Sequence, residues 1–106
     1  MNNTPFQTDQ RYLTRGIHVN VPLEIQIVLW RMIDERLKQV STMDTFQIFK
    51  FNIERNQLII RHIQEQPEHT NTHRLINKQS FKALDGKTIY IIDDTTHATM
   101  LFAEEY

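Results

Sequence analysis

The chain has 106 residues, of which 40% are hydrophobic, and its 12 basic and 13 acidic side chains give a net charge of −1. This length predicts one domain that buries its own core, and the balanced charge creates no global field that would attract nucleic acid. The absence of cysteine excludes disulfides and thiolate metal sites and agrees with a reducing cytoplasm.

The first ten residues, MNNTPFQTDQ, are polar and lack the apolar region of a signal peptide. No run in the chain approaches the roughly 20 apolar residues that cross a membrane. We therefore expect a cytoplasmic protein without a membrane partner. We expect residues 1–10 to form a flexible arm anchored by Phe6, and residues 11–106 to form a single α+β domain.

The segment Arg11–Val19 (RYLTRGIHV) predicts a strand that is interrupted by Gly16. Glycine within a strand often marks a bulge or a close backbone approach. Arg15 beside such a bulge would either bind an anion or be a solvated arginine at a kink in an edge strand.

The segment Pro22–Val40 (PLEIQIVLWRMIDERLKQV) predicts the longest helix, because Pro22 suits its first turn and no later proline or glycine interrupts it. Its apolar side chains cover roughly 220° of the circumference, whereas a surface helix needs a stripe of about 100°. We therefore expect cover on two sides. A sheet supplies one side, and the chain's own tails or a second subunit supply the other.

Asp34 falls among apolar residues on this helix, close to Trp30. A carboxylate there is costly unless it is paired or hydrogen-bonded. One interpretation is an acid–base or ligand-binding group with a shifted pKa. The other is a structural ion pair with Arg11 or Arg15 at the edge of the core.

A β-hairpin is predicted by Thr45–Arg55 (TFQIFKFNIER) and Leu58–Gln64 (LIIRHIQ), with a tight turn at Asn56. The apolar alternation of the first strand changes parity between Ile48 and Phe49. This change predicts either a bulge or a strand covered on both faces.

The polar segment Glu65–Asn71, which contains Pro67, predicts a loop, and Thr72–Ile76 predicts a short edge strand. Lys78–Leu84 predicts one helical turn or an irregular crossing, before a turn at Asp85-Gly86.

Two further strands are predicted over Lys87–Asp93 and Thr99–Phe102. The order of elements therefore predicts an α+β fold, in which an antiparallel sheet of four to six strands packs against one long helix at about residues 22–40.

No motif with a known catalytic mechanism is present, because the two glycines form no phosphate loop and neither serine lies in a nucleophile elbow. Asp93 and Asp94 with His97 would bind a divalent ion or perform acid–base chemistry, or would form a polar turn.

His69 and His73 have the spacing of a helical zinc pair, with Glu65 or Glu68 as a third ligand, but their context predicts a loop. His62, between apolar neighbours on a strand, is expected to be a half-buried histidine with its hydrogen bonds satisfied. We expect no catalytic residue, no metal and no cofactor.

Basic residues on a shared sheet face would favour nucleic acid, and the candidates are Arg11, Arg15, Lys50, Arg55, Arg61 and Arg74. Acidic residues are interspersed among them. Stacking of bases on Phe49, Phe51 or Tyr90 is conceivable, but we expect those rings to face the helix.

Three blocks of the chain, RYLTRGI from Arg11, VPLEIQIVLWRMID from Val21 and IYIIDD followed by TMLFAEEY at the C-terminal end, resemble the domain of unknown function 960 family. The resemblance covers Arg11 to Tyr106. That family comprises small uncharacterised proteins of staphylococci and other Firmicutes, some of them carried on mobile genetic elements. The resemblance implies a host-interaction or DNA-maintenance accessory role and assigns no catalytic residue.

We therefore expect a small non-catalytic binding module whose partner is another protein or a second copy of itself. Its contact surface is predicted at the flank of the helix around Trp30 and at the C-terminal residues Glu104, Glu105 and Tyr106. Further candidate binding residues are Arg15, Asp34, Asp93 and Asp94. The alternatives are a nucleic-acid-binding accessory protein and a small enzyme that uses Asp93, Asp94 and His97.

Overall fold

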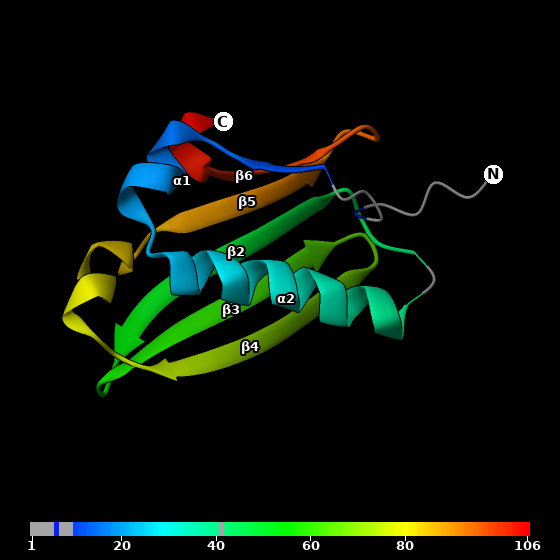
Figure 1. Ribbon diagram of the computed structural model, residues 1–106. Helices are drawn as coiled ribbons and strands as arrows, with labels where there is room; N and C mark the ends of the chain where they lie inside the picture. Colours follow the sequence, from blue (N-terminus) through cyan, green and yellow to red (C-terminus); the bar gives the residue numbers. More distant parts are fainter. Residues whose placement is uncertain (1–5, 7–9, 41) are drawn as a thin grey trace.

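The computed structural model describes residues 6, 10–40 and 42–106. Six strands form one sheet, and a long helix crosses one of its faces (Figure 1). The strands are β1 (Arg11–Leu13), β2 (Phe46–Glu54), β3 (Gln57–Glu65), β4 (Glu68–Ile76), β5 (Thr88–Asp93) and β6 (Ala98–Phe102). The helical segments are α1 (Arg15–Asn20), α2 (Leu23–Gln39) and the short 3-10 helices η1 (Gln79–Leu84) and η2 (Ala103–Glu105). The predicted α+β class is confirmed.

The strands lie in the order β1-β6-β5-β2-β3-β4. All neighbouring strands are antiparallel except β1, which runs parallel to β6. The β2–β3 hairpin turns at Arg55 and Asn56, whose φ angles of 50° and 62° are those that a two-residue hairpin turn requires. No described helix is long and apolar enough to cross a membrane.

Strand β2 is continuous, and no bulge accompanies the change of parity in its apolar residues. Its residues pair one for one with β3 and with β5. Because side chains alternate between the faces of a strand, Phe49 and Phe51 face α2 while Phe46 and Ile48 face the opposite side. The parity change therefore marks a strand with apolar residues on both faces.

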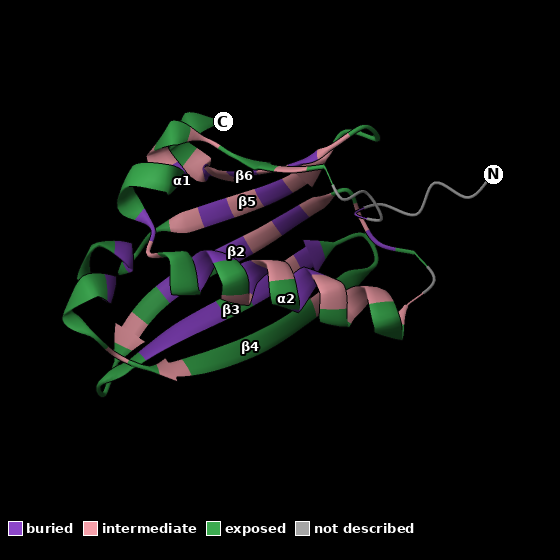
Figure 2. Cartoon of the chain, viewed as in Figure 1, coloured by how far each residue is buried: buried purple, intermediate pink, exposed green. Residues whose placement is uncertain are grey.

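The hydrophobic core lies between α2 and the sheet, where Figure 2 shows the buried residues of both elements. Ile25, Leu29 and Ile33 of α2 are completely buried in one cluster that includes Phe49 of β2 and Ile60 of β3. Leu23 and Ile27, on the rest of the wide apolar arc, are 69% and 46% exposed. No described element therefore covers that part of α2.

The prediction of one strand over residues 11–19 was wrong, because β1 ends at Leu13 and α1 follows. The Oγ1 atom of Thr14 accepts a hydrogen bond from the N–H of Ile17 at 3.3 Å and caps α1. Gly16 lies on this helix, where the carboxylate of Glu105 approaches its backbone. The glycine thus marks a close approach and not a bulge.

The prediction of a loop over residues 65–71 was also wrong. β3 and β4 continue on both sides of a two-residue turn at Gln66-Pro67 and pair over nine positions. Seven of the nine β4 side chains are exposed. Backbone pairing with β3 holds this edge strand, so its sequence carries no apolar alternation.

Phe6 is 1% exposed and belongs to the core, and the carbonyl of Gln10 accepts a hydrogen bond from the N–H of Ala98. Residues 1–5 and 7–9 of the predicted arm lie outside the described residues. A flexible arm and the division at residue 10 therefore stay predictions.

Candidate functional site

The sheet face that points away from α2 carries a cluster of apolar side chains. They come from β2, β5 and β6 and from the C-terminus, and we call them the open-face patch: Phe46, Ile48, Tyr90, Ile92, Leu101 and Tyr106. The first five are partly exposed, and Tyr106 is 77% exposed. Tyr106 packs onto this cluster through its contacts with Phe46 and Tyr90.

Three aromatic rings form the centre of the open-face patch. The ring of Tyr106 lies edge-on to Phe46 and to Tyr90, with centroids 5.5 and 5.8 Å away. The rings of Phe46 and Tyr90 are 4.7 Å apart. Edge-on packing of this kind is a favourable geometry for aromatic pairs, so Tyr106 has a defined position although most of its surface faces solvent.

The residues before Tyr106 are held by polar contacts. Glu105 Oε1 accepts hydrogen bonds from Thr14 Oγ1 at 2.7 Å and from the N–H of Phe102 at 2.8 Å. Glu104 forms an ion pair with Lys87 at 3.0 Å. Both acidic residues of the predicted binding tail are therefore engaged within the chain, and they fix the position of Tyr106.

A group of basic residues lies beside the open-face patch on the same side of the sheet. Lys50 and Arg61 are directly opposite each other in the β2–β3 register, and Arg74 follows on β4. All three side chains are exposed. Arg11 does not join them, because it points to the α2 side, and Phe49 and Phe51 are buried beneath α2.

Trp30 and Asp34 lie on the other side of the sheet, where both contact Arg11. The Arg11 guanidinium lies over the indole at 4.8 Å from the centroid. It also forms two hydrogen bonds to the Asp34 carboxylate, one of them 3.2 Å long from Nη1 to Oδ2. The ion pair that was predicted between Asp34 and Arg11 is therefore present. Trp30 and Tyr106 do not form one surface, because the sheet separates them.

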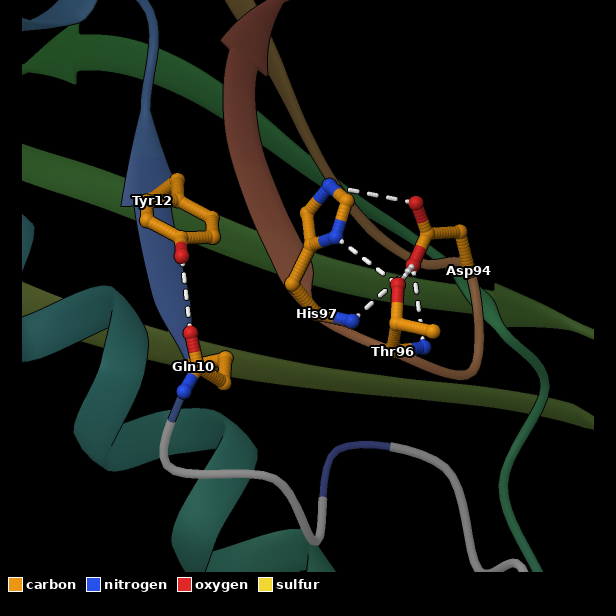
Figure 3. A network of polar contacts seen from close by, with 5 residues as sticks. All are labelled: Gln10, Tyr12, Asp94, Thr96 and His97. Atoms are coloured by element: carbon orange, nitrogen blue, oxygen red, sulfur yellow. Dashed lines mark hydrogen bonds and ion pairs between the residues drawn. The ribbon is translucent and has the colours of Figure 1, made fainter.

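Asp94 and His97 lie in the turn between β5 and β6, and their side chains contact each other (Figure 3). Asp94 Oδ1 accepts hydrogen bonds from the N–H groups of Thr96 and His97, and Oδ2 lies 3.1 Å from His97 Nε2. The pKa of the Asp94 carboxyl is lowered from its ordinary value, mainly by the hydrogen bond from the N–H of His97. Tyr12 packs edge-on against the imidazole at 5.1 Å.

The contacts of Asp94 stabilise the backbone of this turn. The Asp94 side chain is 51% exposed, and its carboxylate accepts hydrogen bonds from backbone N–H groups of its own turn, as short polar side chains commonly do. Asp93 does not share these contacts, and its N–H donates to the carbonyl of Thr45. The three residues therefore do not converge on a common point.

His69 and His73 lie on strand β4, where four residues span about 13 Å. Glu65 and Glu68 are on the opposite face of the sheet, by the alternation of the paired strands. The described residues contain no group of three side chains that would hold a metal ion. Arg15 is exposed at the start of α1, and the carboxylate that approaches this helix is that of Glu105.

A buried polar chain beneath α2 could not be found from the sequence pattern. Gln47 Oε1 accepts a hydrogen bond from His62 Nε2 at 2.6 Å, and Gln47 Nε2 donates to Gln64 Oε1 at 2.9 Å. His62 is only 3% exposed and stacks on Phe49. Burial, and then the charges of His69 and Arg36, lower the pKa of His62 to about 4. The imidazole is therefore neutral at physiological pH. It makes a hydrogen bond, to Gln47, as expected, but it is buried and not half-buried as predicted.

The fold defines a small α+β protein with a six-stranded sheet covered by a helix on one face. A family described as "Staphylococcal protein of unknown function (DUF960)" matches residues 10–105. The chain therefore belongs to the domain of unknown function 960 family, as its sequence blocks indicated.

Among solved structures, a protein of unknown function from Enterococcus faecalis is similar in fold. It has a TM-score of 0.77 and 20% sequence identity, and the match covers 92% of this chain and 90% of that chain. At this identity the likeness establishes the fold alone. The comparison with curated proteins gave no match.

Proposed function

We propose that this protein is a non-catalytic binding module that recognises a protein partner through the open-face patch. The observation that supports this proposal is a sheet whose two faces are both apolar, while α2 covers only one of them. An exposed cluster of apolar side chains with polar residues around it is typical of a protein-interaction site. Tyr106 is the natural anchor, because exposed tyrosines often contribute most to binding at interfaces.

The surroundings of the patch define the chemistry of the partner. Lys50, Arg61 and Arg74 border it on β2, β3 and β4. A partner that places apolar side chains on Phe46 and Tyr90 would gain from carboxylates at its rim, because complementary charges at a rim accelerate association and select partners. We therefore expect a protein surface with an apolar centre and an acidic border.

A second candidate function is binding of single-stranded nucleic acid at the same face. Lys50 and Arg61 are like charges at directly opposite positions, an arrangement that destabilises a sheet and would be relieved by a phosphate. Tyr90 and Tyr106 would supply stacking surfaces. The net charge of −1 argues against this function, and a steep loss of affinity with rising salt would support it.

Affinity capture from a nuclease-treated lysate of the host cell tests the proposal. Three baits are compared: the wild-type protein, Leu101→Lys in the open-face patch, and Ile27→Lys, a matched control on the exposed flank of α2. We expect a protein that the wild type and Ile27→Lys retain and that Leu101→Lys loses. If all three baits retain the same proteins, the open face is not the binding surface.

A further inference from the structure

The two edges of the sheet differ in how they are protected from further strands. The edge strand β1 has three residues and is followed at once by α1. The edge strand β4 has nine residues, pairs with β3 without a bulge, and contains neither proline nor lysine. Short strands, bulges, prolines and lysines are the usual means by which proteins protect sheet edges. Strand β4 has none of these four features, carries only Glu68 and Arg74 as charged acidic or basic residues, and pairs with no further strand in the described residues.

The charges along β4 are divided between its ends on the open face of the sheet. Glu68 begins the strand opposite Glu65 of β3, so two carboxylates are adjacent near the turn. Arg74 lies towards the other end of β4 on the same face, opposite Ile59 of β3. Among the described residues, Glu65, Glu68 and Arg74 form no ion pair. The edge is therefore acidic at one end and basic at the other.

We propose that a second copy of this chain pairs with this edge, β4 against β4, antiparallel about a two-fold axis at Asn71. Directly opposite residues of an antiparallel pair lie on the same face of the sheet, so the axis must pass through a residue position. An axis at Asn71 places Glu68 opposite Arg74 of the second copy, and Arg74 opposite its Glu68. Within β4, axes at residues 70, 72 and 73 place no opposite charges across from each other.

The same register is favourable on the helix side of the sheet. Asn71 meets Asn71 of the second copy, and two amides can donate to and accept from each other. His73 lies opposite His69 of the second copy. Beside it, a hollow of about 140 Å³ has space for an incoming side chain and is lined by Val28, Arg31, Met32, Glu35, Asn71 and His73. The pairing would join the two sheets into one of twelve strands, twice the six of each copy.

This surface shares Arg74 with the basic border of the open-face patch, but the patch itself lies apart from β4, since β3 lies between β2 and β4 in the sheet. Self-association through β4 would therefore leave Tyr106 and Tyr90 accessible. It would also present two open-face patches on one side of the joined sheet, an arrangement that increases the avidity for a repeated or dimeric partner.

Sedimentation velocity over a concentration series from micromolar to millimolar tests the proposal. We expect a monomer–dimer equilibrium for the wild type. Glu68→Arg and Arg74→Glu each replace two attractive pairs by two repulsive ones, so each should raise the dimer Kd by about tenfold or more. The double variant Glu68→Arg/Arg74→Glu restores opposite charges and should return the Kd to within about threefold of the wild type.

Two controls accompany these variants. Arg15→Glu makes the same change of charge as Arg74→Glu on α1, beside the opposite edge strand, and should not alter the Kd. Circular dichroism confirms that each variant is folded. A wild type that stays monomeric throughout, single variants that dimerise like the wild type, or a double variant that fails to recover would each overturn the proposal. A dimer lost instead in Leu101→Lys would place the contact on the open face and overturn it too.

Discussion

A Cβ atom added at Gly16 would lie 2.5 Å from the Oε2 atom of Glu105. Glu105 follows Gly16 by 89 positions in the sequence, and its carboxylate lies beside α1. It accepts hydrogen bonds from the hydroxyl of Thr14, which caps α1, and from the N–H of Phe102. This contact holds the C-terminus beside α1 and sets the position from which Tyr106 reaches the open face.

The effect of Gly16→Ala should therefore depend on Glu105. In the wild type the new methyl group displaces the carboxylate and breaks its two hydrogen bonds, at a cost of roughly 1–2 kcal/mol. In a Glu105→Ala background the space is free, and alanine in a helix is more stable than glycine by about 0.5–1 kcal/mol. Urea unfolding of the four proteins in this cycle measures the coupling. Equal effects of Gly16→Ala in both backgrounds would contradict the contact.

Stability should fall in mild acid because His62 is buried and neutral. Its pKa is about 4 in the folded protein, against the ordinary histidine pKa of 6.5 in the unfolded chain. Between these values the unfolded state binds one more proton, so the free energy of unfolding falls as the pH falls. The loss is fully developed at about pH 4 and amounts to roughly 3 kcal/mol.

The variant His62→Gln isolates this contribution. A glutamine can still donate to Gln47 Oε1 but does not titrate. We expect this variant to be less stable at pH 7, because it loses the stacking of the imidazole on Phe49, and to lose less stability between pH 7 and pH 4.5. Chemical denaturation at the two pH values measures the difference. Parallel losses in both proteins would show that His62 is not responsible.

The Trp30 side chain should contribute more to stability than the Arg11–Asp34 ion pair does. The Arg11–Asp34 pair is partly exposed, with 25% and 47% of the two side chains accessible. Asp34→Ala should therefore cost about 1 kcal/mol or less, whereas Trp30→Ala should cost roughly 2–3 kcal/mol, below the value for a fully buried ring. Thermal unfolding of both variants checks this order. An Asp34→Ala protein that is clearly more stable than the wild type would mark Asp34 as a residue kept for function.

Local signals predicted the elements whose stability is local. Helix α2 has an uninterrupted apolar repeat, and the β2–β3 hairpin has a turn that tolerates positive φ. The helical wheel placed Asp34 among apolar residues, which predicted an ion pair with Arg11 or Arg15, and the partner is Arg11. The sequence predicted the second half of β4, Thr72–Ile76, as an edge strand, and missed the first half because backbone pairing with β3 holds it. Helix α1 was missed because a six-residue helix is defined by the Thr14 cap and the distant Glu105 contact.

The candidate surface was partly visible in the sequence. The change of parity at Ile48 and Phe49 predicted either a bulge or a strand covered on both faces, and the structure has apolar residues on both faces without a bulge. Tyr106 was among the predicted binding residues. The pairing of Tyr106 with Phe46 and Tyr90 depends on the order of β2 and β5 in the sheet, which no local pattern contains. For the same reason Trp30 and the tail were expected on one surface, although the sheet lies between them.

The most direct test of the proposed function places a photo-crosslinking residue on each face of the protein in living host cells. One position is Leu101 in the open-face patch, and the matched position is Ile27 on the exposed flank of α2. We predict a protein adduct from Leu101 that disappears when Tyr106→Ala is added, and none from Ile27. An adduct from Ile27, with none from Leu101, would contradict recognition through the open face and move the contact to α2.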